Sequence, residues 1–411
     1  GCGDCSIQSS CVSIEPLETS LGRKRKINQS NCNKDYTCIK GFCPSFVTVD
    51  AQLKSNTVFR EIGDLPDPER NVNNEISNIM LTGIGGTGVL TISAILAYAA
   101  HFEGKDSSVM DMTGLAQKGG AVWSHIKIYE KGIKPFSQKI SPGSADLLLA
   151  CDAVVGTKPE IQEVVSDEKT TTVINNNTIP VSDFVTDREL DFKDNEVLEM
   201  ITKTTKKVAS SIPAIKISEI LSGDAIGTNM VMLGSAYQNG LIPLKAENII
   251  NAIKLNGVGI ERNIYNFSLG RLYVIDPENE LFDFLSKDKV KKLGFEELYE
   301  DRLSRIEKYD QRVVKDFQKT KEGIDSLLST EVDSERLNID AIKELYRVFA
   351  IKDEYEVAKM HLETTSNVLD GQFKDWKNLS FYLSPPMLSF IKDKRTGRPR
   401  KIKVPGYIAI P

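Results

Sequence analysis

The sequence predicts an α/β fold in three parts: a cysteine-rich segment at 1–50, a central domain at 76–258 with a mostly parallel sheet, and a mainly helical domain at 259–411. Residues 51–75 are expected to form a linker. Three observations predict this division. Six of the seven cysteines precede residue 50. Strand and helix patterns alternate through the centre, and charged residues with helical apolar spacing fill 296–369.

Length and charge narrow the class of protein. A chain of 411 residues is long enough for about two to three domains with real cores. The formal net charge of −5 argues against nucleic acid or an anionic membrane as a partner. No stretch of about 20 apolar residues is present to span a bilayer, and we expect a cytoplasmic protein. Because the chain begins with Gly1 rather than Met, we interpret it as part of a longer polypeptide.

The cysteine spacing is typical of thiolate ligands on short, irregular loops. Cys2 and Cys5 form a C-x-x-C step, and Pro44 follows the last cysteine as in bacterial ferredoxins. A cysteine two residues before Gly1 would form a further C-x-x-C step with Cys2. We therefore predict a ferredoxin-like segment with an iron–sulfur cluster of the 4Fe-4S type, with a zinc site or a disulfide framework as alternatives. The candidate ligands are Cys2, Cys5, Cys11, Cys32, Cys38 and Cys43.

A basic stretch at 23–26 lies between the two cysteine groups. One interpretation is a solvated loop. The other is that these cations offset the negative charge of a thiolate-bound cluster or dock an acidic electron carrier.

A strand, a glycine-rich turn and a helix are predicted at 79–82, 83–88 and 89–102. This order fits a phosphate- or dinucleotide-binding turn, because glycines let backbone N–H groups approach an anion at a helix N-terminus. Asp111, at the end of a second strand at 107–110, stands where a ribose-binding carboxylate would lie. Alternatively, the glycines only allow tight strand–helix packing or face another chain. The candidate residues are Gly83, Gly85, Gly86 and Gly88.

A second glycine pair precedes a further strand at 122–128. Gly119 and Gly120 would let a ligand or another backbone come close. Lys118 could contact a carboxylate or phosphate, or be solvated. We interpret His125 as a hydrogen-bonded sheet residue rather than a catalytic base.

The remaining patterns complete an α/β layer. Strands are predicted at 145–152, where Cys151 is a core thiol, and at 171–175; helices are predicted at 217–221 and 229–237. Gly234 within the last helix indicates close packing against a neighbour. Near the end, 381–386 and 396–401 have loop composition, with Arg395, Arg398 and Arg400 either binding a carboxylate or phosphate, or solvated.

Taken together, these motifs resemble the fused indolepyruvate ferredoxin oxidoreductases, a branch of the 2-oxoacid:ferredoxin oxidoreductases. The resemblance covers nearly the whole chain. The stretches that carry it are 1–5, 15–19, 22–25, 31–35, 40–46, 83–88, 117–120, 352–358 and 396–400.

The resemblance implies an oxidoreductase that decarboxylates a 2-oxoacid at thiamine diphosphate and Mg²⁺ held in upstream domains. Clusters would carry the electrons to ferredoxin or a similar acceptor, with CoA as a further partner. The centre would be a gamma-type catalytic domain rather than an NAD site, with 83–88 and 118–120 shaping the substrate or CoA side. We expect a homo-oligomer, and a chain that is inactive alone because its thiamine domains are missing. The alternatives are a non-catalytic electron relay and a NAD-dependent reductase.

Overall fold

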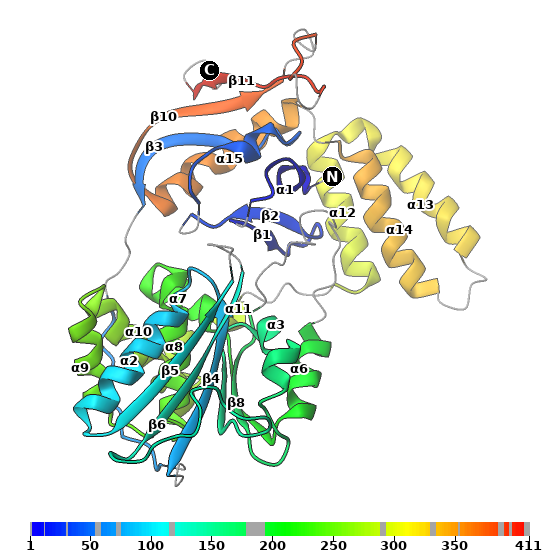
Figure 1. Cartoon of the computed structure of the whole chain (residues 1–411). Helices are drawn as coiled ribbons and strands as arrows, with labels where there is room; N and C mark the ends of the chain where they lie inside the picture. The colour runs from blue at the N-terminus through cyan, green and yellow to red at the C-terminus, as the bar shows by residue number, and fades with distance from the viewer. Residues whose placement is uncertain are drawn as a thin grey trace.

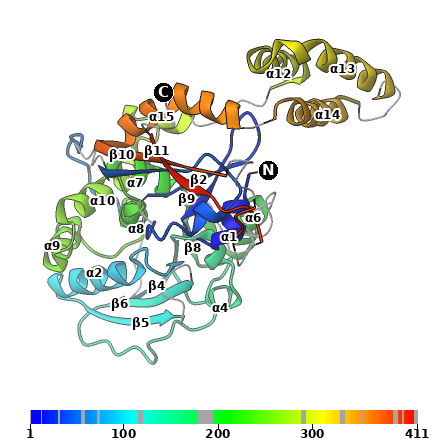
Figure 2. The same cartoon turned by 90° about the horizontal axis from the view of Figure 1, so that it is seen from above.

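The computed structural model describes residues 2–11, 13–29, 32–53, 59–70, 75–114, 120–177, 194–287, 293–328, 334–351, 354–384, 390–393 and 397–406. Figure 1 shows three bodies: a central α/β domain, the cysteine segment above one edge of its sheet, and a C-terminal module beside and above that segment. Figure 2 shows the same arrangement from above. No helix in these ranges is long and apolar enough to cross a membrane.

The central domain is built on a six-stranded sheet with strand order β5-β6-β4-β7-β8-β9. Strands β4, β7, β8 and β9 run parallel, whereas β6 is antiparallel to both β4 and β5. The predicted α/β class with a mostly parallel sheet is confirmed. The strands are β4 (Ile76–Ile84), β5 (Asp106–Thr113), β6 (Ala121–Tyr129), β7 (Leu147–Ala150), β8 (Thr171–Asn175) and β9 (Lys207–Ile212).

Helices cover both faces of this sheet because its central strands are apolar on both sides. Ile79 and Leu81 of β4 pack into one core with helices α2, α8, α9 and α10, and Met80 packs into a second core with α4 and α6. The helices of the domain are α2 (Val89–Phe102), α3 (Ala153–Gly156), α4 (Pro159–Gln162), α6 (Asp194–Thr204), α7 (Ala214–Ser222), α8 (Thr228–Gln238), α9 (Ala246–Asn256), α10 (Ile260–Ile275) and α11 (Phe284–Lys287), with short 3-10 turns η2 (Ala225–Gly227) and η3 (Glu280–Phe282).

Helices α8 and α10 cross at a pair of glycines. A Cβ atom on Gly234 would lie 2.0 Å from the carbonyl oxygen of Phe267, and one on Gly270 would lie 1.9 Å from that of Val231. The two backbones are therefore in direct contact, as the sequence predicted for Gly234. Because α10 shares this core, the central domain continues past the predicted boundary at 258.

The predicted linker at 51–75 is only partly a linker. Strand β3 (Val47–Leu53) runs into it, and residues 59–70 lie along the central domain with Phe59, Ile62 and Leu65 packed against its core. The ring of Phe59 lies 4.7 Å from that of Tyr265. The polar composition of this segment led to the linker prediction. A few apolar side chains are enough to hold an extended segment against a core.

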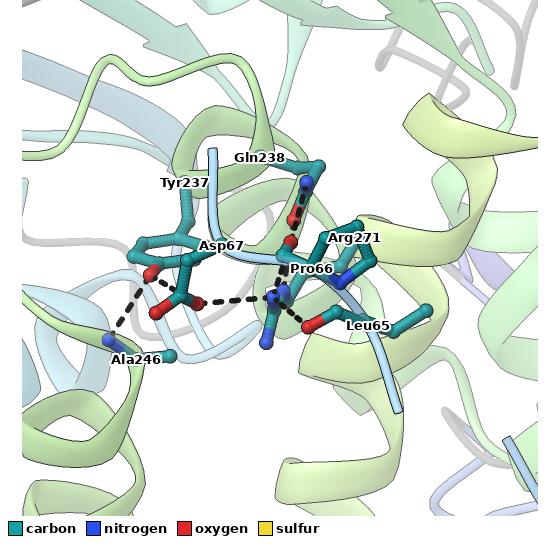
Figure 3. Close-up of polar contacts among 7 residues, drawn as sticks. All are labelled: Leu65, Pro66, Asp67, Tyr237, Gln238, Ala246 and Arg271. Atoms are coloured by element: carbon teal, nitrogen blue, oxygen red, sulfur yellow. Dashed lines mark hydrogen bonds and ion pairs between the residues drawn. The ribbon is translucent and has the colours of Figure 1, made fainter. Parts of the chain in front are cut away.

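Buried Arg271 on α10 fixes this segment in place, as Figure 3 shows. Its guanidinium donates to the carbonyl oxygens of Leu65 and Pro66, both at 3.0 Å, and pairs with Asp67 at 3.2 Å. The hydroxyl of Tyr237 donates to the same Asp67 carboxylate at 2.8 Å. We call residues 59–70 the strap.

The C-terminal module, residues 293–406, combines helices with strands. Helices α12 (Phe295–Tyr309), α13 (Val314–Leu328) and α14 (Ser334–Phe349), with η4 (Gln311–Val313), enclose a small core around Phe317. Helix α15 (Glu354–Gln372) then leads into β10 (Phe373–Leu383) and β11 (Ile402–Pro405). Strand β10 pairs antiparallel with both β11 and β3. The loop predicted at 381–386 is therefore wrong for Phe381–Leu383, because a distant strand supplies the pairing.

We predict that Gly234→Ala lowers the free energy of unfolding by about 3 kcal/mol or more, since its methyl group would force two helix backbones apart. Gly323→Ala is the matched control: this α13 glycine has no atom within 4 Å of its would-be Cβ, so alanine should stabilise by about 0.5–1 kcal/mol. Urea unfolding of both variants provides the measurement. Equal effects at the two positions would contradict the close crossing.

Candidate functional site

The cysteine segment consists of two short helical turns and a hairpin. Helix α1 (Asp4–Ser9) carries Cys5, and η1 (Thr37–Lys40) carries Cys38. Strands β1 (Ile14–Leu17) and β2 (Lys24–Ile27) pair between them. The two turns are in contact at Gly41, where a Cβ atom would lie 2.8 Å from the Cα of Cys5. This contact brings the first and second cysteine groups together.

The Asp4 carboxylate ties these groups to the C-terminal module. Its Oδ2 atom accepts hydrogen bonds from the Phe42 backbone N–H at 2.6 Å and from Arg398 Nη1 at 2.7 Å. Although burial acts to raise the pKa of Asp4, the hydrogen bonds from Arg398 and Phe42 hold that pKa below its ordinary value. Arg398 thus binds a carboxylate, one of the two roles considered for it, and the carboxylate belongs to the same chain.

All seven cysteines are free thiols, so the structure pairs none of them in a disulfide framework. Burial and the neighbouring thiols of Cys2 and Cys43 raise the pKa of Cys5. Burial and the thiols of Cys11, Cys5 and Cys32 raise the pKa of Cys38 to about 11. The six predicted ligands therefore share one neighbourhood, close enough for their charges to act on one another.

In the described ranges, no group of three or more His, Cys, Asp or Glu side chains could hold a metal ion. A polynuclear iron–sulfur cluster needs its thiolates farther apart than a single metal ion does, because the cluster itself lies between them. The donor chemistry fits such a group: several thiols on short turns, with cationic side chains beside them.

Lys401 is one of these cations. It donates from Nζ to the carbonyl oxygen of Cys43, and its ammonium lies 5.5 Å from the centre of the Phe46 ring. Burial lowers the pKa of Lys401, while Cys43 and Asp4 act to raise it. Sequence reasoning assigned no role to Lys401, whose partners lie more than 350 positions away.

The predicted basic stretch 23–26 is mostly the strand β2. Arg23 pairs with Glu18 at 2.5 Å and Lys26 with Glu15 at 3.3 Å. Two of its cations thus have carboxylate partners within the hairpin. The predicted loop is wrong for Lys24–Ile27, which form a strand, although Lys26 is exposed to solvent.

The glycine-rich turn lies at the carboxyl end of β4. Gly83 is within β4, and Gly86 and Gly88 have φ values of 89° and 93°, a left-handed conformation that favours glycine. The N–H of Gly85 donates to the carbonyl of Gly120 at 2.7 Å. Lys118 and Gly119 lie outside the described residues. The turn leads directly into α2, whose N-cap Gly88 offers no side-chain cap.

This turn stands at the topological switch point of the sheet. The chain leaves β4 toward α2 on one face, and leaves the neighbouring parallel strand β7 toward α4 on the other. Open α/β sheets bind ligands outside such a point. Sequence reasoning missed two residues that hold the backbone at this point. Asn229 donates to the carbonyl of Thr87 in the glycine-rich turn at 2.8 Å, and Asp152 accepts from the Val155 N–H at the start of α3 at 2.8 Å.

A shallow recess next to this point has a volume of about 10 Å³, no more than a single water would need. Asp152 contributes to its lining, together with Asn175 at the end of β8. Burial raises the pKa of Asp152 to about 6. Asn175 donates to the Cys151 carbonyl at 3.0 Å and so joins the ends of β7 and β8. The lining residues are Asp152, Ala153, Val154, Asn175, Asn176, Asn177, Val197 and Leu198.

The dinucleotide hypothesis does not fit this topology. In that fold the ribose-binding acid follows the strand beside the glycine turn. Here β6 lies between β4 and β5, which places Asp111 about 10 Å, two strand spacings, from β4. The Asp111 carboxylate instead accepts from Ser93 at 3.1 Å and from Ser124 at 2.5 Å.

His125 and Cys151 have structural roles, as predicted. His125 is 1% exposed and accepts a hydrogen bond at Nδ1 from the Ile140 N–H at 3.3 Å. Burial lowers its pKa to about 4, so the ring is neutral at pH 7. Cys151 lies in the core, and burial raises its pKa.

Comparisons with known proteins agree with this fold. The family described as pyruvate ferredoxin/flavodoxin oxidoreductase matches residues 78–273, and a family of unknown function, DUF6537, matches 295–410. The chain is 32% identical over 178 residues to the common gamma subunit of pyruvate/ketoisovalerate oxidoreductases from Pyrococcus furiosus, covering 42% of this chain and 82% of the relative. It is 28% identical over 183 residues to indolepyruvate oxidoreductase subunit IorB from Methanothermobacter thermautotrophicus, covering 44% and 87%.

A solved structure, pyruvate oxidoreductase subunit PORC from Thermotoga maritima, aligns at 18% identity with a TM-score of 0.32, covering 48% of this chain and 96% of that one. No conclusion rests on that superposition. The matched relatives define the central domain as a gamma-type oxidoreductase domain. The chain belongs to the 2-oxoacid:ferredoxin oxidoreductase family, as its resemblance predicted. The two matched ranges do not include the cysteine segment.

We predict that Asp152→Asn stabilises the protein at pH 7 by about 1–3 kcal/mol, because asparagine keeps the cap on α3 but carries no buried charge. The folded-state pKa lies above the ordinary value of 3.8. The ionised carboxylate therefore weakens the fold most above pH 6, and the difference between variant and parent should vanish as pH falls toward 4.

Urea unfolding from pH 4 to 8 tests this. Asp310→Asn is the control, because Asp310 also caps a short turn but hydrogen bonds from Arg312 lower its pKa. That variant should show no gain at pH 7. A pH-independent effect of Asp152→Asn would contradict the account.

Proposed function

We propose that this chain is the electron-carrying and gamma-type part of an indolepyruvate-type 2-oxoacid:ferredoxin oxidoreductase in the cytoplasm. The observation that carries the proposal is the gathering of six free thiols at the contact between α1 and η1. Family membership supports the reaction class. The general reaction joins a 2-oxoacid anion and CoA thiol into an acyl thioester, and releases carbon dioxide, one proton and two electrons.

The thiols divide into two interleaved sets under this proposal. Cys5 is influenced by Cys2 and Cys43, and Cys38 by Cys11, Cys5 and Cys32, so Cys5 lies where the two sets meet. The last cysteine of each sequence group thus belongs with the other group, as in two-cluster ferredoxins. When bound, an iron–sulfur cluster supplies reversible one-electron transfer. The chain's own residues would hold it, exclude water through α1, and surround it with cations.

The glycine-rich turn at the switch point of the sheet would face the substrate or CoA. The support for this role is the left-handed turn at Gly86 and Gly88 and the uncapped start of α2, which suit an anionic group. Thiamine diphosphate and Mg²⁺ would be held in domains outside this chain. The chain alone would then carry electrons without decarboxylating a 2-oxoacid, and the complete enzyme would act as a homo-oligomer.

The experiment is anaerobic reconstitution with ferrous iron and sulfide, followed by metal, sulfide and EPR analysis. We predict iron and sulfide in the parent chain. Cys43→Ser should remove one EPR signal and Cys11→Ser another, each with about half of the iron. Cys151→Ala is the control, since that thiol lies in the central core and its loss should leave iron content unchanged.

Binding of zinc instead of iron would overturn the electron-transfer function. Adding the upstream domains and assaying 2-oxoacid-dependent dye reduction then separates an enzyme part from a simple relay. Dye reduction that needs CoA and is lost in Cys43→Ser supports the enzyme. If the assembled protein retains its iron but reduces no dye, the chain acts as an electron relay only.

A further inference from the structure

The C-terminal module reaches back to the cysteine segment along two routes. Strand β10 pairs with β3, which follows shortly after Cys43; Phe381 stands opposite Val47. Helix α12 provides the second route, because Arg302, only 2% exposed, donates to the carbonyl of Ser20 in the β1–β2 turn. Arg305 of the same helix donates to the Ser20 hydroxyl at 3.5 Å. This module, which matches a family of unknown function, thus lies beside and above the cysteine segment (Figure 1).

The end of this module places two cations beside the thiols. Arg398 pairs with Asp4 at 2.7 Å, so those two charges offset each other. Lys401 donates to the Cys43 carbonyl and lies over the Phe46 ring. Cys43, Cys5 and Cys38 lie within its electrostatic reach, and Cys43 has the largest effect of the three. Because its hydrogen bond holds the Lys401 ammonium at Cys43, this charge lies next to the set to which Cys43 belongs.

We propose that the C-terminal module supplies a positioning residue for electron transfer, with Lys401 raising the reduction potential of the cluster held by Cys2, Cys5 and Cys43. This inference rests on the proposed function of those thiols. A cluster becomes more negative when it accepts an electron. A nearby positive charge stabilises the reduced form, and it does so more strongly where the groups are partly shielded from water.

The test is an anaerobic redox titration of the reconstituted chain, followed by EPR. Lys401→Met should lower the equilibrium constant for one-electron reduction of one cluster about tenfold. This corresponds to a shift of its reduction potential by ~59 mV to a more negative value. Lys401→Arg should restore the parent value. Lys403→Met is the matched control: it removes the same charge from exposed β11 and should leave the potential unchanged.

The outcomes separate the two proposals. A parent chain without iron fails the proposed function itself. Iron bound normally with an unshifted potential in Lys401→Met overturns the role of Lys401 alone. Loss of iron in both Lys401→Met and Lys401→Gln, with retention in Lys401→Arg and Lys403→Met, supports a charge that holds the cluster. Loss of iron in all three Lys401 variants would show that the side chain acts by packing, and would overturn the proposal.

Discussion

The arrangement of the cysteine segment depends on the hydrogen bonds that the buried Asp4 carboxylate accepts. It accepts from the Phe42 N–H, which joins the two cysteine groups, and from Arg398, which joins them to the C-terminal module. Only 7% of Asp4 is exposed, and a buried carboxylate without such partners would be costly. The same side chain thus fixes both the internal geometry of the segment and its outer support.

The cysteine segment is also where the other parts of the chain meet. Asn28 donates to Glu219 on α7 at 2.7 Å and to Glu15 in its own hairpin at 2.8 Å, which links it to the central domain. Arg302 links it to α12. These contacts hold the cysteine segment between the central domain and α12.

Much of the central domain follows from the sequence, and the reasons are local. The turn at 83–88 requires glycines, β4 and α2 show their own periodicities, and Gly234 lies at a helix crossing that admits no side chain. The spacing of the cysteines predicts that they are ligands, and that role stays a prediction. What escaped prediction depends mostly on contacts distant in the chain: the strap held by Arg271, the pairing of β10 with β3, and the role of Lys401. Asp152 was missed although its contact is local, the cap on α3.

The most direct test of the account is hydrogen–deuterium exchange of Asp4→Ala compared with the parent chain. If Asp4 joins the cysteine groups to the C-terminal module, exchange should accelerate together in 32–43 and 397–406, while α12–α14 keep their protection. Asp35→Ala, which removes an exposed carboxylate that accepts from the nearby Thr37, should leave exchange in 397–406 unchanged. Acceleration confined to 2–11 in Asp4→Ala would contradict the central claim.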